Sequence, residues 1–132
     1  MAGRRLHVNT AGELMKSYKL VMPEHLNQFG HIFGGNLLKW ADEYAWIAAS
    51  LEYPECKLVT VGMEEVSFKA NVKEGSILEF DLMRIKEGST SVQYRVDVYS
   101  NLRGDEKILI FETNITMVNL DENDRKKKLP GK

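Results

Sequence analysis

The sequence lacks several features that mark particular classes of protein. Its one cysteine, Cys56, cannot form an internal disulfide. A formal net charge of −1 excludes a general electrostatic attraction to nucleic acid or to an anionic membrane. No apolar run resembles a signal peptide or a membrane span. One cysteine and three histidines show no metal-ligand spacing. We therefore expect a cytoplasmic protein with no metal site and no nucleic-acid or membrane partner.

The length of 132 residues suits one domain that buries about two-thirds of the surface of its unfolded chain. We expect a mobile N-terminal arm over 1–15, the folded domain over 16–120 and a basic C-terminal tail over 121–132. The simplest interpretation of the cationic run 125–128 is a tail whose side chains are solvated. The alternative is that some of them meet phosphate groups of a ligand as point charges.

The pattern of apolar residues predicts one helix and five strands. After Gly35, apolar residues recur every three or four positions, as one buried helix face requires, up to Tyr53, which precedes a proline. Turn chemistry at 74–75, 87–88 and 101–105 separates the strand-like runs. Since one helix must cover one face of the sheet, the fold class is α+β. The helix face comprises Leu37, Leu38, Ala41, Ala45, Ala48 and Ala49, and the strands are 16–22, 57–70, 77–86, 89–100 and 107–119.

Two glycines, Gly34 and Gly35, lead into this helix. A helix N-terminus presents backbone N–H groups without intrahelical partners together with the positive end of the helix dipole. Without side chains, the glycines let a ligand oxygen approach those groups closely. The turn can therefore stabilise an oxyanion, although a helix start that packs closely on a strand would look the same.

Asp42 lies on the flank of the predicted helix. A helical wheel places Asn36, Lys39, Glu43 and Ser50 on the solvent face, and Asp42 falls outside that arc, one turn before Trp46. A partly desolvated carboxylate costs free energy and is retained mainly where it has a partner or a task. A structural role for Asp42 is an equal alternative on the helix alone, and Asn27 alone is typical of a turn.

Taken together, these residues resemble a known pattern. The string NQFGHIFGGNLLKWADE resembles that of hot-dog-fold acyl-CoA thioesterases, in which an Asn, a Gly three residues on and a Phe-Gly-Gly run lead into a central helix carrying an acid. KLVTVGMEEVSF, KEGSTSVQYRVDVYS and ETNITMVNLDENDRKKKLP resemble the later strands and the tail, so the likeness runs from about 19 to 130. It implies an antiparallel sheet of about five strands wrapped around one long helix. Asn71 stands where many relatives have a proline.

The resemblance implies hydrolysis of acyl-CoA to a carboxylic acid and CoA, with no cofactor beyond the coenzyme A of the substrate. Asp42 would be the general base or the nucleophile, and Asn27 would orient water or substrate. The carbonyl oxygen would meet backbone N–H groups of the turn formed by Phe33, Gly34, Gly35 and Asn36. The CoA moiety would lie near Gly88, Ser89, Thr90 and Ser91, which read otherwise as a hairpin turn.

The resemblance also implies a homodimer, or a tetramer or hexamer built from dimers, with Asp42 of one subunit facing Asn27 of the other. Trp40, Tyr44 and Trp46 fit either an extensive subunit contact or core packing.

Two other functions remain open. A hot-dog dehydratase would use a histidine with a helix acid, here His31 with Asp42 or Glu43. A non-catalytic acyl-CoA-binding module would keep the glycine turn and the dimer, yet it would not need a carboxylate beside the thioester. Asp42 together with Asn27 therefore favours an enzyme.

Overall fold

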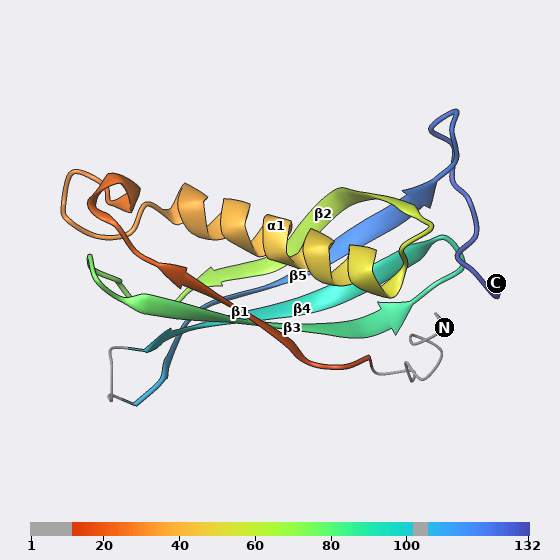
Figure 1. Cartoon of the computed structure of the whole chain (residues 1–132). Helices are drawn as coiled ribbons and strands as arrows, with labels where there is room; N and C mark the ends of the chain where they lie inside the picture. The colour runs from red at the N-terminus through yellow and green to blue at the C-terminus, as the bar shows by residue number, and fades with distance from the viewer. Residues whose placement is uncertain (1–11, 102–105) are drawn as a thin grey trace.

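One antiparallel sheet of five strands carries a single long helix along one face in the computed structural model, which describes residues 12–101 and 106–132 (Figure 1). The strands lie in the order β1-β3-β4-β5-β2, so β1 and β2 form the two edges. The elements are β1 (Met15–Leu20), a short 3-10 helix η2 (Pro23–His25), α1 (Gly34–Glu52), β2 (Lys57–Phe68), β3 (Ile77–Glu87), β4 (Ser91–Asn101) and β5 (Ile108–Leu120).

These elements confirm the predicted fold class, and the strands agree with the sequence to within a few residues. The first strand ends at Leu20, earlier than expected, because the chain turns into η2 at Pro23. The helix begins at Gly34 rather than after Gly35, so both glycines belong to its first turn. It ends before Tyr53, whose non-helical backbone is the geometry expected of a residue that precedes a proline.

The buried face of α1 packs against the inner face of the sheet. Five of the six predicted positions are buried, but Leu38 is only partly buried and Trp40 lies in the core instead. Tyr44 packs its ring against Phe80 of β3 at 4.9 Å between centroids. Helix and sheet thus share one apolar core, to which α1 contributes Leu37, Trp40, Ala41, Ala45, Ala48 and Ala49.

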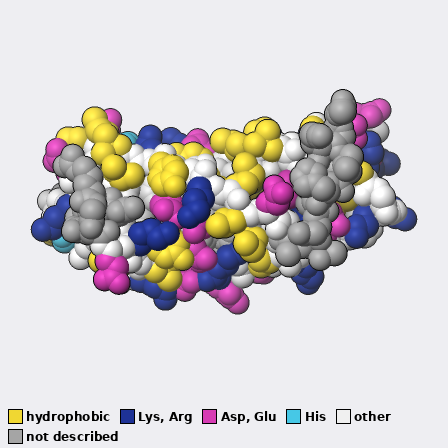
Figure 2. All heavy atoms as spheres, turned by 60° about the horizontal axis from the view of Figure 1, so that its bottom comes forward, with side chains coloured by type: hydrophobic (Ala, Val, Ile, Leu, Met, Phe, Trp, Pro, Cys, Tyr) yellow, Lys and Arg dark blue, Asp and Glu magenta, His cyan; other side chains and the backbone are white. Residues whose placement is uncertain are grey.

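The outer face of the sheet mixes charged and apolar side chains, as Figure 2 shows. Glu79 of β3 is almost fully buried there and binds the ammonium groups of Lys16 and Lys107 at 2.8 and 3.1 Å. Asp81 lies two residues further along β3, on the same face, 3.8 Å from Lys16. This face therefore holds two neighbouring carboxylates with cations around them.

The C-terminal segment lies against the turn between β3 and β4. The backbone N–H of Leu129 donates to the carbonyl of Ser89 at 2.9 Å, and the N–H of Lys127 donates to Asn119 at 2.8 Å. The Leu129 side chain is buried, while residues 125–128 are exposed. Most of the expected N-terminal arm, 1–15, lies outside the described residues, and Met15 already begins β1.

Candidate active site

Asn27 organises the loop that leads into α1. Its side-chain oxygen accepts hydrogen bonds from the backbone N–H groups of Phe29 at 2.9 Å and His31 at 3.2 Å. These bonds orient the amide, so the side-chain nitrogen points away from the loop backbone. Among the described residues, no protein group accepts a hydrogen bond from that nitrogen, which leaves two N–H donors for a ligand or for water.

The N-terminus of α1 has two backbone N–H groups with no protein acceptor in the described part of the chain. Phe33 N–H donates to His25 at 2.9 Å, and Asn36 N–H donates to Phe33 at 2.9 Å. The Asn36 side chain also binds the carbonyl of His25, at 3.1 Å. Of the four donors expected here, this leaves the N–H groups of Gly34 and Gly35 for a ligand.

At both positions a side chain would push against a phenylalanine ring. A Cβ on Gly34 would lie 3.1 Å from the ring of Phe68 in β2, and one on Gly35 would lie 2.8 Å from the ring of Phe33. The two phenylalanine side chains are themselves more than half exposed. The glycine turn therefore lies beside aromatic surface that this chain alone does not cover.

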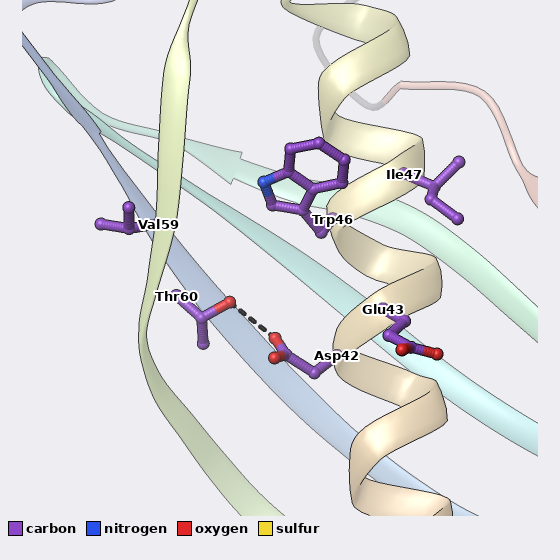
Figure 3. Close-up of a pocket in the computed structure, with 6 residues that line it drawn as sticks. All are labelled: Asp42, Glu43, Trp46, Ile47, Val59 and Thr60. Atoms are coloured by element: carbon purple, nitrogen blue, oxygen red, sulfur yellow. Dashed lines mark hydrogen bonds between the residues drawn. The ribbon is translucent and has the colours of Figure 1, made fainter.

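Asp42 lies on the flank of α1 that faces the edge strand β2, and its side chain is half-buried. Thr60 of β2 donates its hydroxyl to the Asp42 carboxylate at 2.6 Å (Figure 3). An extra residue, Val61, follows Thr60 where the pairing of β2 with β5 shifts register. Bulges of this kind often lie next to active sites, where they re-aim a side chain.

Thr60 was not among the residues expected from the sequence. Because side chains alternate along a strand, Thr60 lies on the same face of β2 as the buried Leu58. This alternation was the one feature of the sequence that pointed to Thr60. Which helix residue it would meet depends on how β2 lies beside α1.

An open groove of about 680 Å³ runs beside Asp42 between α1 and β2. This volume is in the range of small-molecule sites. Trp46 and Ile47 of α1 and Val59 of β2 are its apolar lining residues. Figure 3 shows Trp46 on the same side of α1 as the Asp42 and Thr60 pair, and Ile47 on the side away from β2. The indole N–H of Trp46 donates to the carbonyl of Leu58 at 3.0 Å, so a second hydrogen bond joins α1 to β2 here.

Glu43 has the exposed side chain that was expected, and it also touches the groove that Asp42 lines. The reason is the breadth of the groove, which extends around α1 far enough to reach two adjacent residues about 100° apart on the helix.

A single chain does not bring the expected site residues together. Asp42 comes eight residues after Gly34, so a rise of about 1.5 Å per residue separates them by roughly 12 Å along the helix axis. That is too far for both to act on one carbonyl group. Asn27 precedes Gly34 and lies at the same end of the helix as the glycine turn.

The histidines have other partners than the helix acids. The ring nitrogen Nδ1 of His25 accepts from the backbone N–H of Met22 at 2.9 Å, and the ring meets Trp40 edge-on at 4.8 Å. Over residues 12–101 and 106–132, neither His25 nor His31 forms a hydrogen bond with Asp42 or Glu43. In the same ranges, no three His, Cys, Asp or Glu side chains group as metal ligands, and no helix is long and apolar enough to cross a bilayer.

The turn between β3 and β4 is a hairpin turn that the C-terminal segment holds in place. Gly88 N–H donates to Ser91 at 2.8 Å, and the carbonyl of Thr90 accepts from the backbone N–H of Asn119 at 2.8 Å. Within the described residues, the hydroxyls of Ser89 and Thr90 form no hydrogen bond with the protein. Of the exposed cations of 125–128, Lys127 and Lys128 come nearest to this turn, because Leu129 is bound to Ser89 and Lys127 to Asn119. Arg125 is bound instead to Asp121.

Known proteins resemble both the sequence and the structure. Residues 29–105 match the thioesterase superfamily. An uncharacterized acyl-CoA thioester hydrolase of Zymomonas mobilis is 30% identical over 112 residues, which cover 84% of this chain and 74% of that protein.

Solved structures extend the likeness. An acyl-CoA hydrolase from Staphylococcus aureus, in complex with butyryl coenzyme A, coenzyme A and coenzyme A disulfide, gives a TM-score of 0.81 at 27% identity, over 89% of this chain and 72% of that one. A hexameric thioesterase from Yersinia pestis gives a TM-score of 0.81 at 28% identity, over 91% of this chain and 97% of that one. Other structures of the S. aureus hydrolase carry alanine in place of an asparagine, an aspartate or a threonine. The chain therefore belongs to the thioesterase superfamily and has the hot-dog fold of its acyl-CoA hydrolases.

Proposed function

We propose that this protein hydrolyses acyl-CoA thioesters with Asp42 as the reacting carboxylate. The observation that carries the proposal is the position of Asp42, whose carboxylate is held by Thr60 at the side of an apolar groove. In that position it removes a proton from water that adds to the thioester carbonyl, and the proton passes to the departing thiolate of CoA. Alternatively it attacks the carbonyl itself, which expels the thiolate and forms an anhydride that water then hydrolyses. Thr60 keeps the carboxylate at one orientation.

The other groups of the reaction come from the loop before α1. The free amide N–H groups of Asn27 orient water or substrate, and the N–H groups of Gly34 and Gly35 stabilise the negative charge on the carbonyl oxygen. The S. aureus hydrolase supports this assignment, because the residue types replaced by alanine in its variants are the types of Asn27, Asp42 and Thr60 here.

The active site needs a second copy of the chain. Within one chain Asp42 lies roughly 12 Å along the helix from the glycine turn, so the two parts act on one thioester only if they come from different subunits. The free edge of β2 supports this arrangement, because Val61, Val66 and Phe68 are 60%, 39% and 53% exposed. An apolar strand edge of this kind would promote aggregation unless another strand covered it.

In this dimer Asp42 of one protomer faces Asn27 of the other. The Y. pestis thioesterase is hexameric, which supports dimers that assemble further.

The nucleotide of CoA binds near the turn of Gly88, Ser89, Thr90 and Ser91. The free hydroxyls of Ser89 and Thr90 suit phosphate oxygens, and Lys127 and Lys128 are the cations nearest to them. The bound coenzyme A of the S. aureus structure supports a CoA substrate without assigning these residues.

The first test measures thiol release from a panel of acyl-CoAs. A positioned general base contributes about 10²–10⁴ in rate, so Asp42→Asn should lower kcat/KM by about that factor. At roughly 1.4 kcal/mol for each tenfold, the barrier rises by about 3–5 kcal/mol. Asn27→Ala should also lower kcat/KM, with a modest loss of thermal stability because the backbone N–H groups of Phe29 and His31 lose their acceptor.

Asp97→Asn is the matched control, because it makes the same change on the outer face of the sheet, beside Arg95 and away from α1. It should retain the wild-type rate. Full activity of Asp42→Asn would remove that residue from the mechanism. A wild type that binds acyl-CoA and releases no thiol would instead be a binding module, and hydration of an enoyl-CoA would establish the dehydratase alternative.

A further inference from the structure

We propose that the groove beside Asp42 holds the acyl group of the substrate and that Trp46 sets the length of acyl chain it accepts. The favoured substrates are then short, neutral acyl-CoAs. This proposal rests on the proposed function, since it assigns the groove to one part of the same substrate.

The position of Trp46 carries the argument. It follows Asp42 by four residues, which is about one helical turn, or roughly 6 Å along the axis. Figure 3 shows the indole on the α1 side of the groove, turned toward β2 beside the Asp42 and Thr60 pair. An acyl chain that extends from a thioester at Asp42 toward Trp46 therefore meets the ring after a few carbon atoms.

The indole is a fixed wall rather than a movable side chain. Its N–H donates to the backbone carbonyl of Leu58 at 3.0 Å, so rotation of the ring would break a hydrogen bond. One turn beyond Trp46, the same side of α1 carries the small side chain of Ser50. Shortening Trp46 would thus lengthen the groove along the helix.

The chemistry of the walls favours the acyl group over the pantetheine arm of CoA. Trp46, Ile47 and Val59 present carbon atoms, and the one indole N–H is already bonded to Leu58. The two amides of pantetheine would lose hydrogen bonds to water against such walls, whereas an alkyl chain gains free energy by leaving water there. Glu43, which also lines the groove, disfavours an acyl group that carries its own carboxylate.

The main test compares wild type, Trp46→Phe and Trp46→Ala on saturated acyl-CoAs from butyryl to dodecanoyl. Wild type should show its highest kcat/KM on the short chains. Trp46→Ala should raise the ratio of dodecanoyl to butyryl kcat/KM by about tenfold, or roughly 1.4 kcal/mol of discrimination. Trp46→Phe keeps a ring but loses the bond to Leu58, so its ratio should fall between the two.

An equal loss of kcat/KM at every chain length would overturn the proposal, because it would place the pantetheine arm against Trp46. Wild-type values of kcat/KM at every chain length in Trp46→Ala would overturn it as well. Either result would leave the proposed hydrolysis standing, since thiol release by wild type would still be seen.

A binding measurement tests the assignment of the groove to the acyl group without relying on hydrolysis. Bromine quenches tryptophan fluorescence only near contact, so butyryl-CoA brominated on its acyl chain should quench wild type more strongly than unbrominated butyryl-CoA. Trp46→Phe keeps the buried Trp40 and should lose this difference. Equal quenching of wild type by the two ligands would overturn the assignment of the groove, whether or not the protein hydrolyses them.

Discussion

Thr60 is the residue through which the sheet holds the carboxylate of Asp42, the proposed catalytic group. Its hydroxyl reaches Asp42 from a strand eighteen positions later in the chain. The sequence alone could not identify this pair, because the contact depends on the register of β2 and on the bulge at Val61. Asp42 could be identified, since the helical period places it on the flank of α1 and the residues around it match a family pattern.

Replacing Thr60 should affect orientation rather than binding. A hydrogen bond to a charged group contributes about 1.5–3 kcal/mol, and exposure of Thr60 puts this one at the low end, so Thr60→Val should lower kcat by roughly tenfold. KM and the melting temperature should change little. Thr60→Ser keeps the hydroxyl and should retain most of kcat.

Steady-state kinetics of the two Thr60 variants, together with thermal melts, would check this expectation. A loss in the Ser variant without a loss in the Val variant would mean that the methyl group matters and the hydroxyl does not.

The helix and the strands could be predicted, because apolar residues recur in the local sequence with the helical period of 3.6 residues or the strand period of 2. What local periodicity could not give was where each element lies relative to the others. Glu43 is an example, because its exposure was correct and its place in the groove depends on the gap between α1 and β2. The C-terminal segment is another, since its contact with Ser89 joins residues forty positions apart.

Two acids of β3 make stability depend on pH at the outer face of the sheet. Burial, together with the hydrogen bond to Glu79 and the charge on Glu79, raises the pKa of Asp81 to about 6. The hydrogen bond from Lys16 is the main cause that lowers the pKa of Glu79 to about 2. The folded state therefore favours the protonated form of Asp81, and the stability this contributes is present at low pH and is lost as the pH rises from about 4 through 6.

Asp81→Asn imitates the protonated carboxyl and should remove this loss. The variant should melt a few degrees above wild type at pH 8, and the difference should shrink toward zero near pH 4. Thermal melts of both proteins across that range would check the sign. A variant that is less stable than wild type at pH 8 would show that the ion pair with Lys16 outweighs the cost of burying the charge.

At the scale of the whole molecule, one chain carries all the groups of the proposed site without assembling them. The glycine turn lies at the start of α1, Asp42 lies more than two turns further along, and β2 has an uncovered apolar edge. Sequence reasoning could reach the dimer only through the family resemblance, because a contact between copies leaves no period in the sequence. The exposure of Trp46 illustrates this limit, since its pattern fitted a core residue or a subunit contact equally well.

The measurement that tests the account most directly is complementation between two inactive variants. Asp42→Asn and Asn27→Ala would be unfolded together in equal amounts, refolded, and assayed for thiol release. If each site takes Asp42 from one protomer and Asn27 from the other, a mixed dimer has one intact site of two. Random pairing makes half of the dimers mixed, so activity should return to about a quarter of the wild-type value. No recovery from a mixture proven to contain mixed dimers would contradict the shared site.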